Sequence, residues 1–144
     1  MAKTITKTYI INPRANLHRA DLRQEDFEGE NLEHANFSEA MLYSADFPEA
    51  FLEHADFSKA SLEFTNFYKA NLREANLSDS YSRHAEFIDA NLRNADLRNA
   101  NCIYANFEGA DITKAKLDGM TIDDGLENMY VIGSPEYWKT IDNK

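Results

Sequence analysis

Few of the residue patterns that build disulfides, membrane spans or catalytic sites occur in this chain of 144 residues. The single cysteine excludes an internal disulfide, which is typical of a cytoplasmic protein. No apolar run is long enough to span a bilayer, and we expect no secretory signal because the first residues lack an apolar stretch. We find no glycine-rich phosphate loop, no cysteine–histidine cluster with metal-ligand spacing, and no nucleophile with a matching base. The sequence therefore predicts no cofactor and no metal, and it argues against an enzyme.

Basic residues are also scarce, with 15 against 25 acidic residues and a formal net charge of −10. This balance disfavours binding to nucleic acid or to an anionic membrane, because both repel a negative surface. The shortage is greatest between residues 25 and 56, where ten acids occur without a lysine or arginine. We expect an uncompensated acidic surface there. Its candidate contacts for a basic partner are Glu28, Glu33, Asp46, Glu49 and Glu53.

A five-residue period runs through most of the chain, from residue 15 to residue 124. It is neither the 3.6 of a helix nor the 2.0 of a strand, so it indicates structural repeats. Of the 22 units, 18 have Leu or Phe at the centre, 17 have Ala two residues earlier, and 15 have Asn or Asp between the two. On an extended backbone the Ala and the central residue point the same way, so both should face the core. The Asn or Asp should point outward and bond the backbone of a turn.

This pattern resembles the pentapeptide repeat family, whose motif is Ala-(Asp/Asn)-Leu followed by two variable residues. The resemblance covers about three-quarters of the chain. It implies an all-β fold, a right-handed quadrilateral β-helix (a solenoid) with four of the five-residue units in each coil. About 5.5 coils at the ~4.8 Å spacing of strands would form a rod about 26 Å long.

The sequence also carries a mark of this longer, four-unit period. Every fourth central residue in one series is phenylalanine, and these rings should stack as one interior ladder: Phe27, Phe47, Phe67, Phe87 and Phe107. Alanines at the same spacing should line another wall of the core: Ala35, Ala55, Ala75 and Ala95.

The segments outside the period are expected to cover the two ends of the solenoid. Residues 1–14 should form an N-terminal cap with a strand over residues 4–11, and residues 15–124 should form the β-helix. Residues 125–144 should form a C-terminal cap, a strand followed by a short helix that begins near Ser134 and Pro135. In the first coil Glu25 and Glu30 replace alanine. We expect them to meet water or the basic N-terminal segment, the alternative being a functional pair of perturbed carboxylates.

Two pairs of chemically reactive residues recur at the four-unit spacing. Ser82 and Cys102 occupy central positions, and no histidine is in register to activate them, so we expect an inert, narrow part of the core. His34 and His54 should stack on an outer wall, each after a glutamate, and these residue types can bind zinc. A metal site is nevertheless the weaker interpretation, because this surface is expected to be open and without a pocket.

Apolar side chains at outward positions gather on the wall centred on Leu42, Leu62, Ser82 and Cys102. We regard this wall as the candidate interaction surface, formed by Met41, Tyr43, Phe64, Tyr81, Ile103 and Tyr104. Proteins seldom leave so much contiguous apolar surface in water. We therefore expect it to be covered by the tail around residues 130–138 or by a second copy of the chain.

These observations predict a non-enzymatic protein-binding or scaffold repeat protein whose partner the sequence does not name. A homodimer through the apolar wall or the C-terminal cap is one form that this binding could take. The resemblance implies an alternative, because some family members resemble B-form DNA in shape and charge and bind type II topoisomerases such as DNA gyrase, protecting them from quinolones. This chain shares the acidic rod, but it lacks the protruding loops of those proteins and its acids are concentrated in the N-terminal half, so DNA mimicry ranks second.

Overall fold

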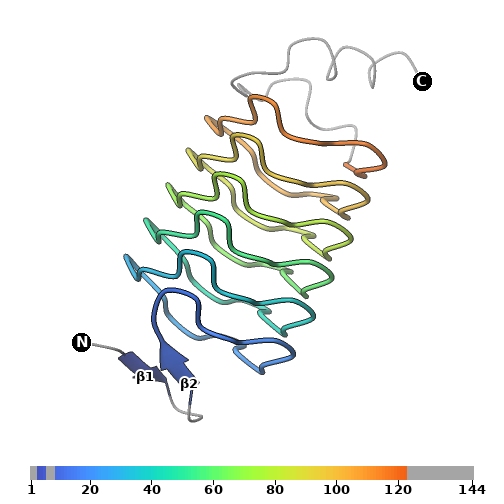
Figure 1. Cartoon of the computed structure of the whole chain (residues 1–144). Coiled ribbons are helices and arrows are strands. Elements are labelled where there is room, and N and C mark those ends of the chain that lie inside the picture. Colours follow the sequence, from blue (N-terminus) through green and yellow to red (C-terminus); the bar gives the residue numbers. More distant parts are fainter. Residues whose placement is uncertain (1–2, 6–8, 123–144) are drawn as a thin grey trace, which may run out of the picture.

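The computed structural model is a stack of similar coils that begins after two short strands (Figure 1). It describes residues 3–5 and 9–122, with strands β1 (Lys3–Ile5) and β2 (Tyr9–Ile11). Beyond β2, parallel bridges join each unit to the fourth unit after it, from Asn16 with Asn36 to Asn101 with Thr121. One coil therefore contains four five-residue units, and the repeat region is a β-helix, as the sequence period predicts.

Each five-residue unit turns a corner with the same hydrogen bond. The carbonyl of Leu52 accepts the amide of Ala55 at 3.0 Å, and the other units repeat this bond with little variation. The third residue of each turn has a left-handed backbone, with φ near 57° at Lys59, as a type II turn requires. Glycine normally supplies this conformation, and a residue with a side chain loses roughly 1–2 kcal/mol there. The left-handed backbone recurs from corner to corner, with glycine at Gly29, Gly109 and Gly119, so it is a property of the fold and does not mark a functional site.

In most units the Asn or Asp before the central residue makes the local bond that the sequence predicts. The Oδ1 atom of Asn36 accepts the amide of Ser38 at 2.9 Å, and that of Asp96 accepts the amide of Arg98 at 3.1 Å. Similar side chains also bond between coils, as Asn76 Nδ2 donates to Asp56 at 3.1 Å. These polar residues therefore fix both the corner and the register of the next coil.

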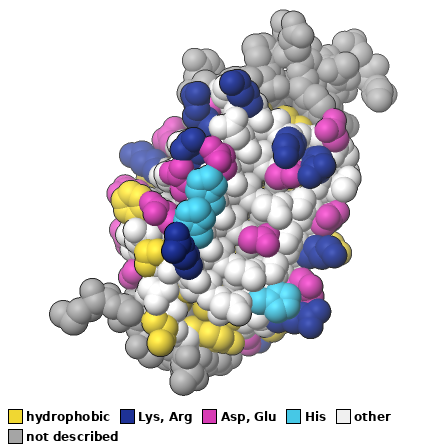
Figure 2. All heavy atoms as spheres, viewed as in Figure 1, with side chains coloured by type: hydrophobic (Ala, Val, Ile, Leu, Met, Phe, Trp, Pro, Cys, Tyr) yellow, Lys and Arg dark blue, Asp and Glu magenta, His cyan; other side chains and the backbone are white. Residues whose placement is uncertain are grey.

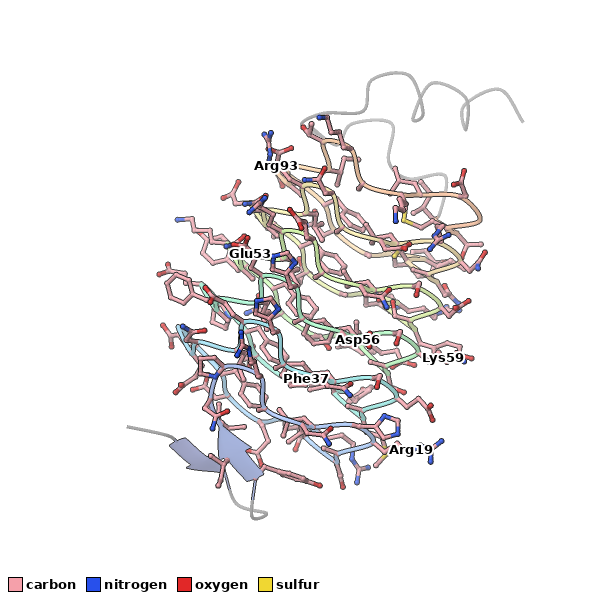
Figure 3. The ribbon with its side chains drawn as sticks, in the orientation of Figure 1. Arg19, Phe37, Glu53, Asp56, Lys59 and Arg93 are labelled. Atoms are coloured by element: carbon pink, nitrogen blue, oxygen red, sulfur yellow. The ribbon has the colours of Figure 1, made fainter. Side chains whose placement is uncertain are left out.

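The core is a narrow column of central residues and alanines. The five phenylalanines expected in one ladder are stacked, with neighbouring ring centroids 4.6, 5.2, 5.1 and 4.8 Å apart and every ring at most 1% exposed. Phe37 and Phe57 form a second stack, 4.7 Å apart, that meets the first ladder edge to face. Phe37 lies inside the coils in Figure 3, while Arg19 and Lys59 project from an edge. The four alanines expected on another wall, Ala35, Ala55, Ala75 and Ala95, are at most 1% exposed.

The N-terminal segment differs from the expected single strand over residues 4–11. Strands β1 and β2 pair antiparallel with Lys3 opposite Ile11, so the chain reverses between them and that prediction is wrong. A single strand of eight residues would extend about 26 Å, longer than any five-residue side of the coil. Pairing two short strands instead lets Ile11 join the core at 2% exposure while Ile10 points outward. The predicted strand and helix of residues 125–144 lie outside the described residues.

Candidate interaction surface

The apolar wall expected from the sequence is an exposed surface of the structure. Five of its six residues are exposed, and Ile103 is half-buried. The exposed fractions are 41% for Met41, 45% for Tyr43, 49% for Phe64, 54% for Tyr81 and 55% for Tyr104. The buried residues behind them are Leu42, Leu62, Ser82 and Cys102. We call this surface the aromatic wall.

Two rings of the aromatic wall, Phe64 and Tyr104, form a column with His84 along the solenoid axis, which we call the outer ladder. Phe64 stacks on His84 with centroids 4.7 Å apart, and His84 stacks on Tyr104 at 5.0 Å. Tyr43 meets Phe64 edge to face at 5.4 Å. The sequence predicts only that His84 points outward. Its place in the ladder could have been found from its spacing, because His84 lies one full coil from both Phe64 and Tyr104.

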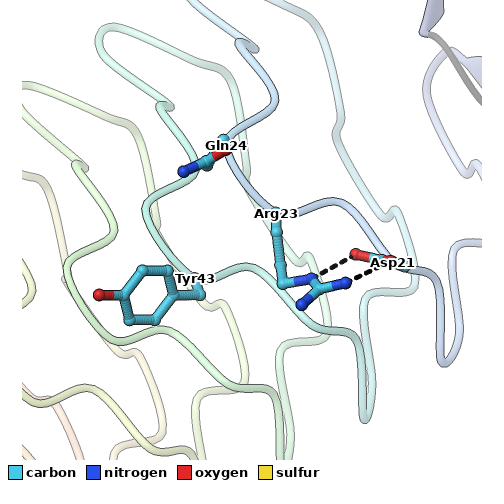
Figure 4. Close-up of a pocket in the computed structure, with 4 residues that line it drawn as sticks. All are labelled: Asp21, Arg23, Gln24 and Tyr43. Carbon is cyan, nitrogen blue, oxygen red and sulfur yellow. Dashed lines mark hydrogen bonds and ion pairs between the residues drawn. The ribbon is translucent and has the colours of Figure 1, made fainter.

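Two arginines, Arg23 and Arg83, lie on the aromatic wall in different coils. The Arg83 guanidinium lies 5.9 Å from the centroid of the Tyr104 ring, within the range of a cation–π contact. In the first coil Arg23 donates to Asp21 through Nε at 2.8 Å and through a terminal nitrogen at 2.9 Å. An open hollow of about 430 Å³ is lined by Asp21, Arg23, Gln24 and Tyr43 (Figure 4). The wall thus combines aromatic edges with guanidinium groups held in place.

Basic residues of neighbouring coils compensate part of the acidic run, which corrects the expectation of an uncompensated surface. Arg73 lies one coil beyond Glu53 and binds it at 2.5 Å, while also binding Glu74 at 2.6 Å. Arg19 lies one coil before Glu39, binds it at 2.8 Å, and lowers the pKa of its carboxyl by this hydrogen bond. Both arginines are outside residues 25–56, so a count along the sequence does not include them.

The other predicted acidic contacts differ in their surroundings. Glu28 and Glu49 are exposed, and Glu33 is half-buried. Asp46 is exposed and accepts a hydrogen bond from Asn66 Nδ2 at 3.2 Å. The charge of Glu53 is partly offset by Arg73, whereas the Asn66 amide that binds Asp46 is neutral and leaves its negative charge in place.

His34 and His54 stack on an outer wall, as their spacing predicts, with centroids 4.7 Å apart and ring planes 7° from parallel. His54 Nδ1 lies 3.4 Å from Glu74 Oε2, and its Nε2 lies 3.7 Å from Glu53 Oε1. Figure 2 shows histidine side chains in a short column beside charged groups of both signs. Parallel rings direct their in-plane lone pairs in parallel, so the two do not converge on one ion. Within the described part of the chain, no three His, Cys, Asp or Glu side chains are arranged to hold a metal.

The reactive groups in the core are held in inert surroundings. Burial raises the pKa of the Cys102 thiol to about 12, which removes the thiolate needed for reactivity at neutral pH. The Ser82 hydroxyl lies 2.9 Å from the Ser80 hydroxyl, and neither side chain is more than 1% exposed. Glu25 and Glu30, the acids at alanine positions, are half-buried and not enclosed in the core.

No helix long and apolar enough to cross a membrane occurs in the described residues, which are formed of coils and two short strands.

Comparison with known proteins gives a consistent result over the repeat region. A family model described as pentapeptide repeat region matches residues 52–125, and one described as pentapeptide repeats (8 copies) matches residues 15–53. No curated protein matches the chain.

Several solved structures are similar. HetL, a pentapeptide repeat protein involved in heterocyst differentiation regulation from the cyanobacterium Nostoc sp. strain PCC 7120, is 29% identical with a TM-score of 0.62 over 81% of this chain and 52% of HetL. This chain therefore spans about half the length of HetL. Rfr23 from the cyanobacterium Cyanothece 51142 is 27% identical with a TM-score of 0.43 over 82% of this chain and 87% of its own. QnrB1, a plasmid-mediated fluoroquinolone resistance protein, is 16% identical with a TM-score of 0.42 over 77% of this chain and 66% of its own.

Proposed function

Because this chain belongs to the pentapeptide repeat family, whose members fold as right-handed β-helices, we propose that it is a non-enzymatic protein-binding protein that recognises its partner through the aromatic wall. The observation that carries this proposal is the set of exposed rings on one wall of a rigid solenoid. Tyr43, Phe64, Tyr81 and Tyr104 are each between 45% and 55% exposed.

Rings of this kind favour protein binding for two physical reasons. Aromatic side chains and arginine are enriched at the centres of protein interfaces, where a few of them supply most of the binding energy. The outer ladder is also preorganised, because stacking between Phe64, His84 and Tyr104 restricts the ring positions before a partner arrives. A preorganised surface loses less conformational entropy on binding. HetL is involved in heterocyst differentiation regulation, and a regulatory role of this kind supports a binding function in place of a catalytic one.

Affinity capture from a lysate of the source organism tests the proposal with three forms of the chain. The first is the wild type, and the second carries Tyr43→Ser, Phe64→Ser and Tyr81→Ser on the aromatic wall. The control carries Phe51→Ser and Tyr68→Ser, which remove exposed rings from other walls, where they are 49% and 37% exposed. Circular dichroism of each form checks that the β-helix is intact.

We expect a partner that the wild type and the control retain and that the aromatic-wall variant loses. With that partner purified, the Kd of the aromatic-wall variant should rise at least about thirtyfold, as loss of one hot-spot ring typically causes. Equal binding by all three forms would contradict a role for the aromatic wall.

DNA mimicry toward a type II topoisomerase is the alternative function, and its surface support is weaker. A mimic must present carboxylates at a density near that of phosphates, about one per ~1.7 Å of duplex axis. The Glu53 carboxylate instead binds Arg73, and that of Glu39 binds Arg19. We expect no strong inhibition of DNA gyrase supercoiling. Strong inhibition that disappears in a Glu28→Gln, Glu33→Gln, Glu49→Gln variant would place DNA mimicry first.

A further inference from the structure

The chain leaves the described structure on the aromatic wall itself. Thr121 pairs with Asn101, and the carbonyl of Thr121 accepts the amide of Cys102 at 2.7 Å. Ile122, the last described residue, packs against the core at the position one coil beyond Cys102. Residues 123–144 therefore begin on the wall that carries the outer ladder, one coil beyond Tyr104.

The following segment is long enough to cover this wall. Tyr43 lies about four coils from Ile122, which is about 19 Å at the ~4.8 Å spacing of strands. The segment 123–144 can span about 70 Å when extended. Even a compact path back along the wall therefore reaches the whole outer ladder.

The composition of the segment matches the surface that it would meet. Between residues 126 and 138 it carries Leu126, Met129, Tyr130, Val131, Ile132, Tyr137 and Trp138. Residues 123–144 contain five acids and two lysines, so the segment is negative. The aromatic wall offers apolar rings, and its own charges are balanced, because Arg23 binds Asp21 and Glu63 lies on the same wall as Arg83. Apolar burial therefore favours this contact, and charge contributes little to it.

We infer that residues 126–138 bind back onto the aromatic wall of the same molecule and compete with the partner for it. This inference rests on the proposed function only in its second half, the competition. The contact itself has an independent readout, because Trp138 is the only tryptophan in the chain.

Fluorescence of Trp138 in the full-length protein tests the contact. In the wild type we expect blue-shifted emission and protection from acrylamide. The Phe64→Ser, Tyr81→Ser variant should shift the emission to the red and increase quenching severalfold, because it removes the surface on which Trp138 packs. The Phe51→Ser, Tyr68→Ser control should behave as the wild type.

Three outcomes would overturn the contact. Trp138 could be as accessible in the wild type as in the unfolded chain. Trp138 could stay protected in the Phe64→Ser, Tyr81→Ser variant, which would place it elsewhere, such as on the open end of the solenoid. Its protection could also depend on protein concentration, which would identify a second copy as the occupant.

A second variant tests the competition. Tyr130→Ser, Trp138→Ser in the full-length chain should increase binding of the hydrophobic dye ANS, and adding Phe64→Ser should reverse that increase. The same Tyr130→Ser, Trp138→Ser chain should bind the purified partner more tightly than the wild type does. Unchanged partner affinity would overturn the competition, whereas the absence of any partner in all forms would contradict the proposed function and leave the Trp138 result standing.

Discussion

Two ladders of aromatic rings run along this solenoid, one inside and one outside, and their spacings are nearly equal. Neighbouring rings of the inner ladder, from Phe27 to Phe107, are 4.6–5.2 Å apart. In the outer ladder Phe64 and His84 are 4.7 Å apart, and His84 and Tyr104 are 5.0 Å apart. The inner rings are at most 1% exposed, whereas Phe64 and Tyr104 are about half exposed.

The comparison shows that the backbone imposes the stacking and that burial decides its consequence. Coil-to-coil hydrogen bonds hold equivalent residues at the strand spacing on both sides of the backbone. Inside, each ring is removed from water and stabilises the fold. Outside, much of the ring surface stays in contact with water, so the same stacking contributes less to stability and leaves an edge available for a partner.

The largest expected effect comes from removing one ring of each ladder. Phe67→Ala should lower the free energy of unfolding by about 3–5 kcal/mol, because it leaves a cavity in a fully buried stack. Phe64→Ala should cost less than about 1.5 kcal/mol, since it loses only contacts between exposed rings. Urea unfolding followed by circular dichroism measures both. Similar losses in the two variants would remove the distinction between the ladders.

A smaller effect is expected from adding volume on each side of the backbone. Ala75→Leu should cost about 1–3 kcal/mol, because Ala75 is 1% exposed and the narrow core has no room for a larger side chain. Glu86→Leu, at an exposed outward position, should change stability by no more than about 0.5 kcal/mol. Thermal unfolding of both variants makes the comparison. If Ala75→Leu melted with the wild type, the inward assignment of the alanine position would be wrong.

Thiol reactivity compares the two sides of the aromatic wall by a measurement other than stability. Since burial raises the pKa of Cys102 to about 12, its thiolate fraction at about pH 8 is roughly a thousandfold below that of an ordinary cysteine. Native Cys102 should therefore resist iodoacetamide. A cysteine placed in the outer ladder by His84→Cys, in a Cys102→Ser chain, should react readily. Fast modification of native Cys102 would show that this part of the core opens.

The smallest expected effect concerns an outward ion pair. The hydrogen bond from Arg98 lowers the pKa of the Asp96 carboxyl. A carboxyl with a depressed folded-state pKa stabilises the protein above its unfolded pKa, near 3.9, and loses that contribution as the pH falls through its folded pKa. Asp96→Asn should therefore lower the urea midpoint slightly at neutral pH, and the deficit should shrink below about pH 4. When Arg98 is already replaced by Arg98→Gln, adding Asp96→Asn should change the urea midpoint much less. A deficit of the Asp96→Asn variant that does not depend on pH would contradict the ion pair.

The sequence by itself determined the interior of this protein. Alanine and the central residue lie two positions apart, so an extended backbone turns both inward, and the recurrence of phenylalanine at every fourth unit places Phe27 above Phe47. Because these side chains must be buried, they can only point toward the core, so their direction follows from the sequence pattern. The exposed position of Phe64 and Tyr104 followed from the same rule, because positions that do not face the core must face outward.

Only the tertiary structure decided which outward side chains are neighbours. It places His84 between Phe64 and Tyr104, pairs Glu53 with Arg73, and turns the N-terminal segment into the β1–β2 hairpin. Long outward side chains can reach several residues on their own coil and on the coils beside it. Each exposed ion pair contributes only about 0.2–1 kcal/mol, so several pairings have similar free energies. A sequence pattern fixes the column in which such a residue lies. The rotamers and the coil-to-coil contacts, which depend on the assembled solenoid, fix its partner.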